Sequence, residues 1–93
     1  MLTRTVPIRN ALGMHARAAA KFVHVAGGFR CRVTVAREDR AGRIVDGKSI
    51  LGLLLLAAAR GAAIRIMADG ADETDALPAL CALVESGFGE EPC

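Results

Sequence analysis

The segment CRVTVAREDRAGRIVDG (residues 31–47) holds two short runs of alternating apolar residues with a charged stretch between them. Cys31, Val33 and Val35 alternate with polar or small residues, and the second run covers residues 43–45. Residues 38–42 supply charged side chains and a glycine, which is typical of a turn. The pattern therefore predicts a β-hairpin, and with it an antiparallel sheet around which the rest of the chain is arranged.

The sequence on either side of this hairpin predicts alternating strands and helices. Before it, a short strand over residues 5–8 contains Pro7, which belongs on a sheet edge because it has no N–H to donate. A helix over residues 16–26 follows and ends at two glycines. After the hairpin, we expect residues 49–59 to be helical at their start, with a stop signal at residues 60–61, and a strand over residues 64–67.

The C-terminal part of the chain predicts one more helix. An acidic stretch, residues 69–75, suits a helix N-terminus. Pro78 lies inside the expected helix, where a proline costs about 3 kcal/mol, so the helix either begins later or is kinked there. The apolar residues at helical spacing are Leu77, Leu80, Cys81, Val84 and Phe88.

This order of elements predicts an α+β fold, strand–helix–strand–strand–helix–strand–helix. The expected architecture is an open-faced β-sandwich, a four-stranded antiparallel sheet covered on one face by three helices. A chain of 93 residues suffices for one core, so residues 1–93 are expected to form a single domain.

Composition excludes several classes of protein. A formal charge of +2 is too small for general affinity to nucleic acid or membranes, and an RNA-binding sheet would need more aromatic residues than three Phe. The longest apolar stretch, residues 50–59, is far shorter than the roughly 20 residues of a membrane span. With no secretion signal, we expect a cytoplasmic protein. Cys31, Cys81 and Cys93 are expected to be free thiols, without a disulfide framework or zinc site.

The segment GMHAR (residues 13–17) lies where a loop enters the first helix. Free N–H groups and the helix dipole favour an anion at that point. His15 offers a ring nitrogen that can attack phosphorus, and Arg17 can hold phosphoryl oxygens. The simpler reading is that His15 is a helix cap or a surface residue. His24, on another side of the same helix, receives no role.

Two blocks of sequence resemble a known family. NALGMHARAAAKFV (residues 10–23) resembles the active-site signature of HPr, the histidine-containing phosphocarrier of the phosphoenolpyruvate-dependent phosphotransferase system. DGKSILGLL (residues 46–54) resembles that family's regulatory-serine segment. Residues 57–61, 64–66 and 88–90 also follow the family pattern, so the resemblance covers nearly the whole chain.

The resemblance implies a phosphocarrier and not a stand-alone enzyme. His15 would accept a phosphoryl group at its pros nitrogen from enzyme I, with phosphoenolpyruvate as the ultimate donor, and Arg17 would stabilise it. The acceptor would be a domain of the enzyme IIA type, in sugar uptake or in a nitrogen-type regulatory branch. No metal or cofactor and a monomeric state are implied. Ala18 departs from the family, which usually has proline there.

The same resemblance assigns a second set of residues. Ser49 matches a serine that an HPr kinase/phosphorylase modifies in many relatives, although serine is also a good helix cap. Ile50, Leu51 and Leu54 match an apolar docking surface for enzyme I and acceptor domains, although core packing would also explain leucines here. An alternative function is a non-carrier regulatory module that interacts through the surface from Ser49 to Leu54.

Overall fold

The computed structural model describes residues 1–39 and 43–90. The order of its elements is the order predicted from the sequence. Residues 40–42 of the predicted turn and Cys93 lie outside the described part of the chain. The elements are β1 (Leu2–Pro7), α1 (Ala16–Gly27), β2 (Arg32–Arg37), β3 (Ile44–Asp46), α2 (Ile50–Leu55), β4 (Ala63–Asp69), α3 (Glu73–Glu85) and a 3₁₀ turn, η1 (Gly87–Gly89).

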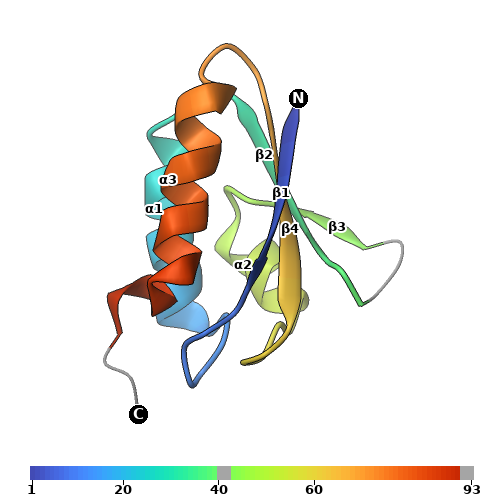
Figure 1. Ribbon diagram of the computed structural model, residues 1–93, viewed down its shortest axis with the longest axis vertical. Coiled ribbons are helices and arrows are strands. Elements are labelled where there is room, and N and C mark those ends of the chain that lie inside the picture. Colours follow the sequence, from blue (N-terminus) through green and yellow to red (C-terminus); the bar gives the residue numbers. More distant parts are fainter. Residues whose placement is uncertain (40–42, 91–93) are drawn as a thin grey trace.

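The four strands form one antiparallel sheet in the order β1-β4-β2-β3. The predicted hairpin is confirmed, because β2 pairs with β3 from Thr34↔Asp46 to Ala36↔Ile44. Pro7 lies on β1, which is an edge strand as its missing N–H requires. The helices lie on one side of the sheet, so the predicted open-faced β-sandwich is confirmed (Figure 1).

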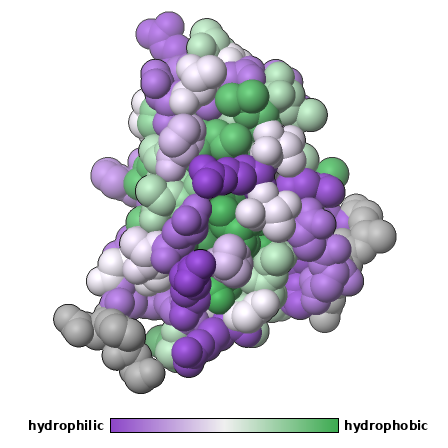
Figure 2. Space-filling model, in the orientation of Figure 1, coloured by the Kyte–Doolittle hydropathy of each residue, from purple (hydrophilic) through white to green (hydrophobic). Residues whose placement is uncertain are grey.

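The core fills the space between the helices and the covered face of the sheet. Val33 and Val35 of β2 and Ile64 of β4 are buried there, and Phe22 from α1 is completely inaccessible to solvent. Burial of a side chain as large as Phe22 stabilises the fold by roughly 3 kcal/mol. Figure 2 shows a band of hydrophobic residues down the middle of the face in view, with hydrophilic residues on both sides.

Helix α2 occupies the first part of the segment 49–59, as predicted. It ends at Leu55, although residues 56–59 are also good helix formers. The chain turns there instead, with Ala57 at a positive φ of 52°. This turn lets the carbonyl of Ala58 accept a hydrogen bond from the N–H of Met14 at 2.9 Å. Contact with the loop before α1 therefore overrides the local helix propensity.

Helix α3 contains Pro78, which decides between the two alternatives predicted for this segment, a later start or a kink at the proline. It starts at Glu73, within the acidic stretch, and continues through Pro78, so the alternative of a start later than the acidic stretch is wrong. Pro78 is solvent-exposed, and so is Thr74, the residue whose carbonyl loses its helical partner to the proline. Water can satisfy that carbonyl, which lowers the cost of the proline.

The two cysteines within the described residues, Cys31 and Cys81, are free thiols, as predicted. Both are buried, and burial raises the pKa of each thiol. In the part of the chain that the structure describes, no helix is long and apolar enough to cross a membrane. The same residues include no group of three or more His, Cys, Asp or Glu side chains arranged to hold a metal ion.

Asp72 connects the start of α3 to the start of β2. Its Oδ2 accepts a hydrogen bond from the N–H of Arg30 at 2.7 Å, and its Oδ1 accepts one from the N–H of Cys31 at 2.9 Å. The hydrogen bond from Arg30, followed by those from Cys31, holds the pKa of the Asp72 carboxyl below its ordinary value. The ionised carboxylate therefore stabilises the folded chain.

We expect Asp72→Asn to lower the melting temperature near neutral pH, because one amide oxygen cannot replace two carboxylate oxygens as acceptors. A group whose pKa is lowered by folding contributes stability above its unfolded pKa and loses it as pH falls through the folded pKa. The difference from wild type should therefore shrink in acid. Thermal unfolding across pH measures this, with Asp75→Asn, whose carboxylate makes no such bonds, as control. A difference that does not vary with pH would contradict the prediction.

Candidate functional site

His15 is the residue that caps the N-terminus of α1. Its backbone is extended, with φ −82° and ψ 179°, and its carbonyl accepts the hydrogen bond from the N–H of Ala19. The ring nitrogen Nδ1 accepts a hydrogen bond from the N–H of Arg17 at 3.3 Å. Nδ1 therefore lies over the N–H groups at the start of the helix, where an anion is favoured.

The loop before His15 is fixed by a close approach of backbone. Gly13 has a φ of +66°, and a Cβ added there would lie 2.5 Å from the carbonyl oxygen of Ala58. Only glycine fits this position without a shift of the backbone. With the hydrogen bond between Met14 and Ala58, this contact holds the His15 loop beside the segment that follows α2.

The second ring nitrogen of His15, Nε2, lies 2.6 Å from Oε2 of Glu90. An ionised carboxylate only accepts hydrogen bonds, so Nε2 carries the ring proton and donates it. The N–H of Arg17 requires a lone pair on Nδ1, which fits the same tautomer. The two contacts together leave Nδ1 as the nucleophilic nitrogen, although His15 is only 23% exposed.

Glu90 is itself held by Asn10, the one buried polar residue within the described chain. The amide nitrogen of Asn10 donates to Oε1 of Glu90 at 2.8 Å and to the carbonyl of Gly13 at 2.7 Å. The hydrogen bond from Asn10, together with weaker effects of His15 and Lys21, holds the pKa of Glu90 below its ordinary value. Glu90 therefore faces His15 as a carboxylate.

Arg17, predicted to stabilise the phosphoryl group, meets His15 through its backbone only. Its side chain is exposed and makes no hydrogen bond or ion pair with the described residues. The guanidinium is thus free to reach an anion at the start of α1, and its role stays a prediction. His24 is exposed on α1, outside these contacts.

The predicted docking residues are exposed. Ser49 caps α2, with its hydroxyl accepting a hydrogen bond from the N–H of Gly52 at 3.1 Å. Leu53 and Leu56 point into the core, which explains how the leucine run divides between core and surface. We define the α2 patch as the exposed large apolar residues of α2 and of the His15 loop, namely Leu12, Ile50, Leu51, Leu54 and Leu55.

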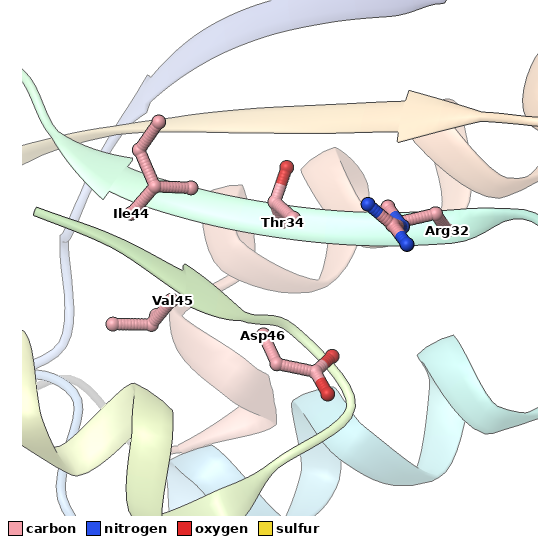
Figure 3. A pocket seen from close by; sticks show the side chains of 5 residues that line it. All are labelled: Arg32, Thr34, Ile44, Val45 and Asp46. Atoms are coloured by element: carbon pink, nitrogen blue, oxygen red, sulfur yellow. The ribbon is translucent and has the colours of Figure 1, made fainter.

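A hollow on the sheet lies outside this site. It is lined by Arg32, Thr34, Ile44, Val45 and Asp46, all from β2 and β3 (Figure 3). None of the predicted site residues contributes to it. The hollow is therefore separate from the candidate site at His15.

Sequence reasoning missed two members of the His15 site, Asn10 and Glu90. Asn10 and Glu90 lie in segments that resemble the family, but the sequence predicts no contact of either residue with His15. Glu90 lies 75 residues from His15 in the chain, so no local spacing indicates the contact. The available signals were a polar residue in an apolar loop and a carboxylate after a buried phenylalanine.

Together, the fold and the site define a small open-faced β-sandwich with a partly exposed histidine at the N-terminus of its first helix. A match to the family described as "PTS HPr component phosphorylation site" covers residues 2–86. The chain belongs to this HPr family of phosphocarrier proteins of the phosphotransferase system, which are not stand-alone enzymes.

Individual relatives agree with this assignment. The chain is 47% identical over 90 residues to the phosphocarrier protein HPr of Neisseria meningitidis serogroup A, covering 97% of this chain and 98% of that protein. It is 40% identical over 88 residues to the phosphocarrier protein NPr of Escherichia coli K12, covering 95% and 96%. The crystal structure of HPr-C-His from Thermoanaerobacter tengcongensis superposes with a TM-score of 0.89 at 40% identity, covering 98% and 99%.

Proposed function

We propose that this phosphocarrier accepts a phosphoryl group on Nδ1 of His15 from enzyme I and passes it to a domain of the enzyme IIA type. The observation that carries the proposal is the position of Nδ1 as an unprotonated cap over the N-terminus of α1. A nucleophilic lone pair and free N–H donors meet there, as phosphoryl transfer requires. The non-carrier regulatory module gives no account of this arrangement and is not favoured.

In the transfer step, the lone pair of Nδ1 forms a bond to phosphorus while the bond between phosphorus and the donor breaks. The electron pair of the broken bond leaves with the donor, and the reverse reaction delivers the group to an acceptor. The N–H of Arg17, which bonds Nδ1 before transfer, is then released to a phosphoryl oxygen. No metal ion or other cofactor is needed by this scheme.

The α2 patch is the proposed contact surface for both partners. The loop that carries Leu12 is bonded to the segment after α2, so the patch and His15 belong to neighbouring elements. Leu12 and Leu51 are 72% and 68% exposed, which is unusual for side chains of this size. Weak binding through such a small apolar surface allows the carrier to exchange partners rapidly.

Incubation with phosphoenolpyruvate and a catalytic amount of enzyme I tests the proposal. We expect a mass increase of one phosphoryl group, lost in acid and retained in alkali. Absence of any label on the folded protein would reject it. The acceptor belongs to sugar uptake or to a nitrogen-type regulatory branch, and transfer from the labelled carrier to a IIA domain of each kind distinguishes the two.

Arg17→Ala is expected to slow phosphorylation about fivefold, the upper range for one exposed ion pair, because the guanidinium no longer meets the phosphoryl oxygens. Stability should hardly change, since the side chain has no partner in the fold. Arg17→Lys keeps the charge without the planar donor pair and should give an intermediate rate. Stopped reactions with enzyme I measure these rates. Equal rates for all three proteins would leave Arg17 as a solvated charge.

A further inference from the structure

The C-terminal segment is anchored so that Glu90 reaches the ring of His15. Phe88 is buried with a positive φ of 59°, and Gly89 follows with a φ of +70°. The side-chain ammonium of Lys21 on α1 donates to the carbonyl oxygen of Phe88 at 2.7 Å. The positive φ angles of Phe88 and Gly89 and the bond to α1 therefore direct the chain back over the start of the helix.

Both carboxylate oxygens of Glu90 are committed at this point. Oε1 accepts from the amide nitrogen of Asn10 at 2.8 Å, and Oε2 lies 2.6 Å from Nε2 of His15. The same Asn10 nitrogen also donates to Gly13, so its orientation is fixed by two acceptors. The carboxylate is held by the loop before His15 and by the ring of His15 itself, at a side-chain exposure of 17%.

The charge of the ring changes when Nδ1 reacts. The ring is neutral while Nδ1 has a lone pair and Nε2 carries the proton. Formation of the bond from Nδ1 to phosphorus uses that lone pair, so the ring gains positive charge with the proton still on Nε2. A carboxylate hydrogen-bonded to Nε2 interacts more strongly with this cationic ring than with the neutral one.

We propose that Glu90 is a positioning residue that fixes the Nε2–H tautomer of His15 and stabilises the positive charge of the ring as Nδ1 accepts the phosphoryl group. This inference rests on the proposed function and deepens it. The bond from phosphorus to the donor breaks, its electron pair leaves with the donor, and the Nε2 proton stays on the ring. Asn10 orients the carboxylate. The buried Phe88 and the hydrogen bond from Lys21 hold the C-terminal segment in the position that places Glu90 beside His15.

A purely structural role of Glu90 differs from the proposed one because it does not require the negative charge of the side chain. If Glu90 only positions the ring through the hydrogen bond to Nε2, then phosphoryl transfer should be nearly unchanged with a glutamine in its place, because the amide oxygen still accepts a hydrogen bond from Nε2. The inference instead requires the negative charge. Glu90→Gln removes the charge and can keep the hydrogen bond to Nε2, although its one amide oxygen cannot also accept from Asn10. Glu90→Ala removes the charge and both hydrogen bonds.

The contact is measured first on the unphosphorylated protein, by NMR of the His15 ring with ¹⁵N labelling. We expect the wild type to show a protonated Nε2, an unprotonated Nδ1 and an Nε2–H proton shifted downfield and protected from exchange. The shift should decrease in Glu90→Gln, and the protection should be lost in Glu90→Ala. An Nε2–H proton that exchanges equally fast in wild type and Glu90→Ala would overturn the inference.

The effect of the Glu90 charge is measured next, as the initial rate and the equilibrium constant of phosphoryl exchange between enzyme I and the carrier. We expect both to fall about tenfold in Glu90→Gln, since a charge-assisted hydrogen bond becomes a neutral one. The control is Glu85→Gln, which removes an exposed carboxylate whose partner is Arg4, at no cost to either quantity. Thermal unfolding confirms that every variant is folded.

Unchanged rate and equilibrium in folded Glu90→Gln would reduce Glu90 to a structural contact and overturn the inference. If the wild type takes no label at His15, then the proposed function fails and the charge role fails with it. The NMR measurement separates the two failures, because it reports the contact between Glu90 and His15 without any phosphoryl donor.

Discussion

His15→Ala is expected to take up no phosphoryl group under conditions that label the wild type to about one group per chain. The substitution removes both ring nitrogens, and within the described residues no other side chain is seen to accept a hydrogen bond from the first N–H groups of α1. The result is measured by mass spectrometry after incubation with phosphoenolpyruvate and enzyme I. Label that persists at the wild-type level in His15→Ala would reject His15 as the acceptor.

Two further variants make this result specific. His15→Ala also deletes a helix cap, which costs about 1 kcal/mol, so a loss of label must be separated from a loss of fold. His15→Asn restores a good cap without a nucleophilic nitrogen, and it should be folded and equally unlabelled. His24→Ala removes the other histidine, which is exposed near the end of α1, and should be labelled like the wild type.

The order of elements could be predicted because the hydrophobic pattern is local. The alternation in residues 31–37 requires one buried face, and Val33 and Val35 are indeed the residues that face the helices. The two glycines at the end of α1 disfavour continuation of the helix, and the proline on β1 removes a hydrogen-bond donor, so these residues indicate boundaries without reference to the rest of the chain. Such signals determined the sheet and the position of His15 at a helix start.

The features that escaped prediction depend on contacts between distant parts of the chain. The end of α2 is set by the hydrogen bond between the N–H of Met14 and the carbonyl of Ala58. The run of Leu and Ala in the sequence does not indicate this contact. The site was likewise incomplete, because the carboxylate on Nε2 comes from the opposite end of the chain. Sequence alone indicates His15 as the proposed nucleophile, whereas the tautomer that leaves a lone pair on one of its two nitrogens follows only from the folded structure.

Ser49 is the proposed point of regulation, and its position allows the effect of charge to be separated from the effect of capping. Its hydroxyl accepts the N–H of Gly52, and aspartate is an equally good N-cap, so Ser49→Asp should leave α2 intact. The new carboxylate would stand next to Ile50 and Leu51 of the α2 patch. A phosphate on Ser49 would place nearly two negative charges at the same point.

We expect Ser49→Asp to slow the phosphorylation of His15 by enzyme I roughly a hundredfold, because an unpaired charge buried in an apolar contact costs about 3 kcal/mol. The matched control is Ser49→Ala, which loses the cap and about 1 kcal/mol of stability but adds no charge, and should react at the wild-type rate. Rates at increasing carrier concentration locate the effect. Since the defect lies in docking, it should raise KM and leave kcat nearly unchanged. Equal KM values for Ser49→Asp and wild type, both folded, would remove Ser49 as a regulatory site and move the docking surface away from the start of α2.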